Sequence, residues 1–273
     1  MTDLTRRGFT TGGALALAGI VLGAPRRAAA QAAPASAGPP DPQLVEDLVA
    51  AGRILVDQNV LDGYGHVSAR HDRDPSRYLM TRSLAPELVT AADIMEYDLE
   101  SNPVDARGRA MFIERFIHGE IYKGRPDVKA VVHCHSPSVI PFGVTGVPLR
   151  PLYHMSAFIW EGVPVFDIRD AMGGMTDMLV RSPAIGHALA RTLGGRAVAL
   201  MRGHGAVIVG ASLPVAVFRS VYLEMNAKLQ AQAMAQSANI RYLEPEEARR
   251  AEASIAGTLG RPWELWKRKA LGK

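Results

Sequence analysis

Two histidines separated by one residue, His133 and His135, have the types and the spacing to do chemistry. They end an apolar, β-branched segment, residues 130–135, which predicts a strand. Alternate residues of a strand point to the same face, so both imidazoles can bind one divalent ion, whereas Cys134 is expected to point into the core and to be inert. Two ordinary surface histidines at a strand end would give the same pattern, so the pair alone does not establish a metal site.

Two further residues favour a metal site. Glu114 precedes His118 by one helical turn in a segment of helical period, residues 112–123, so both side chains are expected on one helix face. A carboxylate there can reach a cation, or a substrate bound to it. His204 stands between two glycines at the end of an apolar strand, where a turn can aim its side chain into a pocket. Three histidines leave a position open on the ion, as a catalytic site requires.

The elements that must position these residues mix strands and helices without a strict βαβ rhythm, which favours a layered α/β domain with a largely antiparallel sheet. The glycine-containing stretches 172–175 and 203–205 lack the strand and helix that flank a dinucleotide fingerprint, so no nucleotide cofactor is expected. Strands are predicted within residues 63–70, 78–81, 94–99, 130–135, 163–166, 197–202 and 206–209, and helices within 43–59, 112–123 and 214–237.

The basic charge of the chain belongs mostly to its N-terminus. The formal net charge is +4, but the first thirty residues contain four arginines and one acidic residue. The remainder is close to neutral, so a nucleic-acid surface has little support. Because Cys134 is the single cysteine, no intrachain disulfide can form.

Residues 1–32 have the layout of a twin-arginine signal peptide. Arg6 and Arg7 precede a mildly apolar stretch, residues 12–22, and small residues near position 30 offer a cleavage site. The stretch is shorter than the ~20 residues that a membrane span needs, although an uncleaved anchor is the alternative. Residues 33–42 are rich in Ala, Pro, Ser and Gly and predict a flexible linker without a packed role, followed by a catalytic domain over 43–273. We therefore expect a periplasmic or secreted protein without membrane association after cleavage.

Three motifs together resemble one known family. The first combines Glu114, His118, Arg125-Pro126-Asp127-Val128 and the pair His133 and His135, with nineteen positions (133 minus 114) from the glutamate to the first histidine of the pair. The second is Arg202-Gly203-His204-Gly205, and the third, Gly65-His66-Val67-Ser68-Ala69-Arg70, is similar to a Gly-Asn-x-Ser-x-Arg pattern. In these motifs the chain resembles the class II aldolase/adducin family from about residue 45 to residue 235.

The resemblance implies a three-layer α/β/α sandwich around a mixed, largely antiparallel sheet, and a homotetramer with active sites between subunits. It implies that His133, His135 and His204 bind a divalent ion and that Glu114 is the catalytic acid/base. His66 is a second candidate for moving the proton. Because histidine sites accept several cations, Zn²⁺ or Mn²⁺ is expected, with Fe²⁺ or Co²⁺ as alternatives.

The sequence departs from the sugar-phosphate enzymes of this family. Phe112 and Ile113 stand where those enzymes carry a Ser-Ser pair before the glutamate, and His66 replaces an asparagine. A phosphate needs clustered hydrogen-bond donors, so a phosphosugar is disfavoured. Arginines beside apolar groups suit a planar carboxylate instead. The candidate substrate-binding residues are Arg82, Arg150 and Ser68.

This pattern resembles the decarboxylase branch of the family, which acts on hydroxylated aromatic or related carboxylates. Loss of carbon dioxide from such an acid leaves an enolate, and a chelating cation stabilises its oxygen. The sequence therefore predicts a metal-dependent lyase acting on a small molecule. The alternatives are an aldolase for a non-phosphorylated hydroxy-carbonyl compound and a non-catalytic, adducin-like binding protein. Intact Glu114, His133, His135 and His204 argue against the last, because a scaffold does not need them.

Overall fold

A mixed seven-stranded sheet lies at the centre of the computed structural model, which describes residues 33–272. Its strand order is β3-β2-β1-β4-β7-β6-β5, and neighbouring strands are antiparallel except β5 and β6. This confirms the predicted mixed, largely antiparallel sheet. The strands are β1 (His66–Arg70), β2 (Arg77–Thr81), β3 (Ile94–Asp98), β4 (Ala130–Cys134), β5 (Val165–Phe166), β6 (Val198–Met201) and β7 (Gly205–Gly210).

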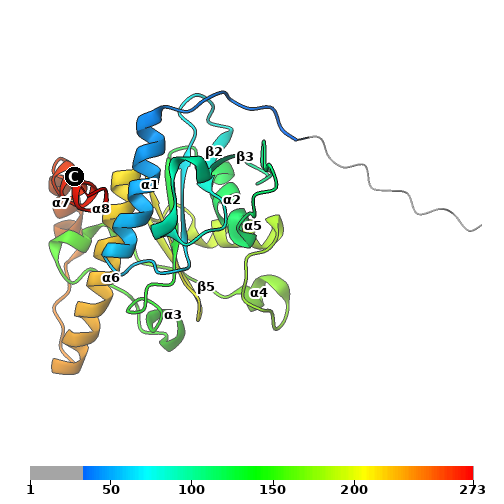
Figure 1. Cartoon of the computed structure of the whole chain (residues 1–273). Coiled ribbons are helices and arrows are strands. Elements are labelled where there is room, and N and C mark those ends of the chain that lie inside the picture. Colours follow the sequence, from blue (N-terminus) through cyan, green and yellow to red (C-terminus); the bar gives the residue numbers. More distant parts are fainter. Residues whose placement is uncertain (1–32, 273) are drawn as a thin grey trace, which may run out of the picture. The chain divides into compact units, whose positions relative to one another are not determined.

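Helices cover both faces of the sheet and give the expected three layers (Figure 1). On one face α1 (Pro42–Asp57), α6 (Leu213–Gln236) and α8 (Gly260–Ala270) share a core with Val132 and Cys134 of β4. On the other face α2 (Phe116–Gly124) and α5 (Pro183–Leu193) share a core with Val131. The remaining helices are α3 (Phe142–Thr145), α4 (Ile168–Met172) and α7 (Pro245–Ala256), with 3₁₀ turns η1 (Pro86–Leu88), η2 (Ala91–Asp93), η3 (Ile113–Arg115) and η4 (His154–Ile159).

Local sequence explains where the main helices begin. The Asp41 side chain accepts from the Gln43 backbone N–H and caps α1, with Pro42 at its first position. Ser212 caps α6 in the same way by accepting from Val215. Both helices then bury an apolar face against the sheet. The long helix predicted over 214–237 and the opening helix predicted over 43–59 are thus confirmed within a few residues.

The helix predicted over 112–123 begins later than expected. Glu114 lies in the 3₁₀ turn η3 with φ −88° and ψ 16°, and the regular helix α2 starts only at Phe116. Glu114 and His118 therefore do not share one regular helix face, and that expectation was wrong. The kink turns the Glu114 carboxylate toward the Val180 backbone N–H, whereas His118 packs against β1.

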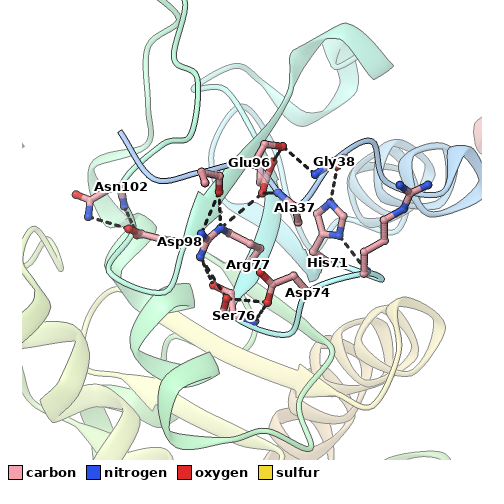
Figure 2. A network of polar contacts seen from close by, with 12 residues as sticks. Ala37, Gly38, His71, Asp74, Ser76, Arg77, Glu96, Asp98 and Asn102 are labelled. Carbon is pink, nitrogen blue, oxygen red and sulfur yellow. Dashed lines mark hydrogen bonds and ion pairs between the residues drawn. The ribbon is translucent and has the colours of Figure 1, made fainter. Parts of the chain in front are cut away.

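The segment predicted as a flexible linker is instead tied to the sheet over residues 35–38, here called the N-terminal strap (Figure 2). Glu96 of β3 accepts from the Ser36 hydroxyl at 2.6 Å and from the Ala37 backbone N–H at 2.7 Å. Arg77 of β2 donates to the Ala35 carbonyl, and the His71 ring lies 3.2 Å from the Gly38 carbonyl. The residues that hold the strap are distant from it in the sequence, so its composition alone did not indicate these contacts.

The predicted signal peptide, residues 1–32 with Arg6 and Arg7, lies outside the described residues. Within the described part of the chain, no helix has both the length and the apolar character to cross a membrane.

Candidate metal centre

His133 projects from β4 on the α2 side of the sheet and is fully buried. Its Nδ1 lies 3.1 Å from the Ala206 carbonyl oxygen, which can only accept, so Nδ1 carries the proton. The Nε2 atom is consequently a free lone pair, and it has no hydrogen-bond partner among the described residues. A buried, orphaned imidazole nitrogen of this kind fits a metal ligand.

Two other imidazoles complete a triangle with His133. His135 follows the last residue of β4, and His204 lies in the turn between β6 and β7. The ring centroids are 5.0 Å apart for His133 and His135, 4.9 Å for His133 and His204, and 4.9 Å for His135 and His204. The Nε2 atoms of His135 and His204 approach to 3.1 Å. Burial, followed by electrostatic interaction with His133 and His204, lowers the pKa of His135 to about 4.

The turn that carries His204 depends on Gly205. A Cβ at this position would overlap the Cys134 carbonyl oxygen of the neighbouring strand. The absent side chain lets β7 pair closely with β4 at the point where His135 leaves the sheet. Glycine is therefore required at position 205, because the backbones of β4 and β7 approach closely there. This close approach brings His204 beside His135.

Glu114 supplies a carboxylate to the same point. Its Oε2 lies 3.5 Å from Nε2 of His133 and 3.5 Å from Nε2 of His204, while Oε1 accepts from the Val180 backbone N–H at 2.9 Å. Burial raises the pKa of Glu114, but interactions with His133 and His204 outweigh it and hold that pKa well below its usual range. The group is therefore an ionised carboxylate.

One ligand atom from each of Glu114, His133, His135 and His204 lies within 4.8 Å of the other three. Imidazole nitrogens and a carboxylate oxygen that converge in this way are the arrangement in which proteins bind a divalent cation. The donor set of three imidazoles and one carboxylate suits Zn²⁺, Mn²⁺, Fe²⁺ or Co²⁺. The sequence-predicted ligands are thus brought together in a geometry that fits one ion.

His66 stands beside the centre without being part of it. It pairs with His133 across β1 and β4, and their ring centroids are 5.1 Å apart. The Phe112 ring packs on the other side at 4.6 Å. His66 Nδ1 lies 2.7 Å from His118 Nε2, and both rings are buried. Burial, followed by electrostatic interaction with His133, lowers the pKa of His118 to about 3, and burial also lowers the pKa of His66.

The predicted substrate residues do not join this group. Ser68 is fully buried, and its hydroxyl lies 2.6 Å from His118 Nδ1 and 2.8 Å from the Tyr122 hydroxyl, so in this structure it is not available to a substrate. Arg82 donates from Nε to Asp93 at 2.6 Å, and this bond, with those of Thr90, lowers the pKa of Asp93 to about 2. The Arg150 guanidinium lies over the Tyr242 ring at 4.1 Å.

Exposed apolar side chains surround the centre, and sequence reasoning did not single out most of them. The Tyr64 side chain is 71 % exposed, with its ring 6.2 Å from His135. Ile113, beside Glu114, is 50 % exposed, and Val144, which packs near Gly203, is 55 % exposed. Tyr64 directly precedes the motif of residues 65–70. Val144 and Met178 reach the site only through folding.

Comparisons with known proteins identify the family to which the fold belongs. The profile of the Class II Aldolase and Adducin N-terminal domain matches residues 46–231. The decarboxylase tropJ of Talaromyces stipitatus is 37% identical over 246 residues, which cover 82% of this chain and 92% of that protein. The 3,4-dihydroxyphthalate decarboxylase of Arthrobacter keyseri is 30% identical over 204 residues, covering 68% of this chain and 77% of that protein. Among solved structures, L-fuculose 1-phosphate aldolase from Glaciozyma antarctica superposes with a TM-score of 0.70 at 22% identity, covering 86% of this chain and 96% of that one.

Proposed function

Because the chain belongs to the class II aldolase and adducin family, we propose that it is a divalent-metal-dependent lyase that decarboxylates a hydroxylated aromatic or related hydroxy-carboxylic acid. The observation that carries this proposal is the four-donor centre of Glu114, His133, His135 and His204. Two relatives named as decarboxylases support the reaction type, and one of them is named for an aromatic dihydroxy acid.

The three histidines and Glu114 have different roles in the proposed reaction. A cation held by His133, His135 and His204 would supply a Lewis acid for negative charge that develops on a substrate oxygen. The ionised Glu114, 3.5 Å from two of the ligand nitrogens, can take up the proton of a substrate hydroxyl and return it to the carbon that loses the carboxyl group. Its second oxygen is fixed by the Val180 backbone N–H, which keeps the carboxylate oriented during that transfer.

The apolar surroundings set the substrate class. Phe112 packs against His66, and Ile113 is half exposed next to Glu114, where a phosphate would need hydroxyl or N–H donors. A dianion against these groups loses hydration without replacement hydrogen bonds, which is costly. A flat ring that carries hydroxyl and carboxylate groups matches both the apolar surface and the cation.

The proposal is tested by a screen for carbon dioxide release. The purified protein, loaded with Mn²⁺ or Zn²⁺, is incubated with a panel of hydroxylated aromatic acids, and a chelator-treated sample serves as control. We expect release from at least one ortho-hydroxy acid and no inhibition by sugar phosphates. Competitive inhibition by a sugar phosphate at micromolar concentration, without carbon dioxide release, would favour the aldolase alternative.

We also propose that Arg82 contacts the substrate carboxylate. Its Nε is held by Asp93, which orients the guanidinium and leaves its terminal nitrogens for a ligand. Arg82→Ala is expected to raise KM for the carboxylate substrate ~10-fold or more, the size of one charge-assisted hydrogen bond. Steady-state kinetics measure this, with Arg150→Ala for comparison. An unchanged KM with a lower melting temperature would mean that Arg82 only braces the η1–η2 loop.

Export through the twin-arginine route is a further part of the proposal. It rests on Arg6-Arg7 and the apolar stretch after them. Replacing both arginines by lysine is expected to leave the precursor in the cytoplasm, because this route depends on the arginine pair. Fractionation and immunoblotting of the two forms measure the effect. Equal periplasmic recovery of the variant would remove the export proposal and leave the enzymatic one untouched.

For the assembly we propose a homotetramer. The exposed apolar side chains near the centre, Tyr64, Ile113 and Val144, support it, because a neighbouring subunit would bury them. Sedimentation equilibrium of the purified protein gives the mass directly, and a monomer at micromolar concentration would contradict the proposal.

A further inference from the structure

The segment between α4 and α5 (Figure 1) supplies a backbone donor to the metal centre. The Val180 N–H donates to Oε1 of Glu114 at 2.9 Å. The other oxygen of this carboxylate, Oε2, lies 3.5 Å from Nε2 of both His133 and His204. Because a carboxylate that is held by one oxygen no longer rotates freely, the direction of the Val180 N–H helps to set where Oε2 lies.

Val180 is fixed through its side chain but not through its N–H. The side chain is fully buried in the apolar core that α2 and α5 share. The peptide plane that carries the N–H belongs to the chain that arrives from Met178 and Leu179. The path of the backbone before Val180 therefore decides whether its N–H meets Glu114.

This path contains a residue in a conformation that its side chain does not favour. Met178 has a φ of 70°, in the left-handed region that residues with a Cβ rarely adopt. The other described non-glycine residues with positive φ are Asn59, Ser101 and Arg107, so Met178 is the one apolar residue in that described set. Backbone strain of this kind persists only where surrounding contacts hold it.

Contacts on both sides hold the strained residue. The Met178 N–H donates to Thr176 Oγ1 at 2.9 Å, and the Leu179 N–H donates to Asp177 Oδ1 at 3.3 Å. The Met178 side chain ends against Gly203, where a Cβ would lie 3.2 Å from its Cε. Since Gly203 has no side chain, the thioether can cover its backbone. We call residues 176–180 the Met178 turn.

We propose that Met178 is a positioning residue that acts through Val180 on Glu114. The left-handed backbone of the Met178 turn directs the Val180 N–H at Oε1 and thereby holds Oε2 at the metal centre. The requirement is for the backbone conformation at position 178 and not for the thioether, whose packing on Gly203 offsets the strain. That a held Oε2 assists proton transfer rests on the proposed function, whereas control of the Val180 N–H does not.

A requirement for backbone conformation predicts a particular order of tolerance at position 178. Glycine adopts positive φ without steric cost and asparagine tolerates it, so Met178→Gly and Met178→Asn should keep the bond although both remove the thioether. Valine strongly disfavours positive φ, so Met178→Val should release the Val180 N–H although its side chain is apolar. Arg107→Val is the matched control, because Arg107 has a φ of 45° in an exposed loop and does not belong to the four-donor group.

The first measurement is NMR of the Val180 amide in metal-free protein labelled with ¹⁵N-valine, assigned from the signal that is missing in Val180→Ile. An N–H that donates to a carboxylate resonates downfield and exchanges slowly with solvent. We expect this signal in the native protein and in the Gly and Asn variants, and an upfield shift with ~10-fold or more faster exchange in Met178→Val. An unchanged Val180 amide in Met178→Val would overturn the proposal, whatever the enzyme turns out to catalyse.

A second pair of variants decides if Met178→Val does not fold. Met178→Ala and Met178→Gly both lack the thioether, but alanine keeps the strain that glycine relieves. The Val180 amide should therefore exchange faster in Met178→Ala than in Met178→Gly. Equal exchange in the two, or slower exchange in the alanine variant, would contradict the proposal.

Turnover of a hydroxylated aromatic acid by the Mn²⁺-loaded protein tests the effect on Glu114. Met178→Val is expected to lower kcat ~10-fold or more with unchanged metal content and a KM within about threefold, because a misplaced catalytic group slows the reaction step more than it weakens binding. Met178→Gly, Met178→Asn and Arg107→Val should keep kcat within about threefold of the native value. If all three variants at position 178 instead raise KM and leave kcat unchanged, the side chain contacts the substrate and the positioning role is wrong. If no such acid is turned over, the proposed function fails and the amide measurement alone decides the role of Met178.

Discussion

Replacing any one of His133, His135 and His204 by alanine is expected to abolish stoichiometric binding of the divalent ion while the protein stays folded. Each imidazole supplies one of the donor atoms that lie within 4.8 Å of one another, and no other His, Cys, Asp or Glu of the described residues belongs to this group. Loss of a supporting contact around a metal typically costs about 10–100-fold in affinity, and loss of a direct ligand costs more. Elemental analysis after dialysis against a weak chelator measures the bound metal.

The control for this experiment is His187→Ala, because His187 is a largely exposed histidine on α5 away from the centre. Circular dichroism and thermal melting establish that the variants fold. Alanine at 133 opens a cavity at a fully buried position and lowers stability, so His135 and His204 give the cleaner comparison. Full metal content in all three alanine variants would show that the ion binds elsewhere.

Glu114→Gln is expected to keep most of the metal and to lose ~10²-fold or more in turnover. The amide has the size of the carboxylate and can still accept from the Val180 N–H, but it cannot take up or deliver the proton. Carbon dioxide release at saturating substrate, together with metal content of the same sample, separates catalysis from binding.

Glu120→Gln is the matched control, because Glu120 is also a buried carboxylate and pairs with Lys123 on the outer part of α2. Its turnover should be unchanged. If Glu114→Gln loses the ion, Glu114 is a fourth ligand. Near-normal turnover with full metal content would move the proton transfer to His66 or another group.

The sequence predicts those parts of the fold whose signals are local. Apolar runs predict β4, β6 and β7, and the motif around the Ala130–Cys134 strand places two ligands at its end. Cys134 faces the apolar core as expected, because alternate strand residues point to opposite faces. The third ligand, His204, is found because its flanking glycines mark a turn.

Other elements lack such signals or carry one that is easily missed. α7 buries only Ala248 and α8 only Trp263, so neither shows a wide apolar stripe in the sequence. α5 does carry a signal, because Ser182 and Pro183 mark its start and its buried residues recur at helical spacing.

The differences between expectation and structure around the site arise from contacts between distant segments. The turn at Glu114 depends on Val180, which lies 66 positions further along the chain. Ser68 was expected at the substrate because its motif suggests it, but pairing of β1 with β4 and packing of α2 close a polar interior around it. Neither arrangement can be obtained from spacing within one segment.

The N-terminal strap decides where a shortened form of this protein can begin. A chain started at Pro42 would lack Asp41, the cap of α1, and would leave Glu96 without its Ser36 and Ala37 donors. The half-buried carboxylate would then face water with only Arg77, 3.7 Å away, as a partner. An affinity tag or a surface linkage therefore belongs before Ala35, where it can be attached or cut off without loosening the sheet.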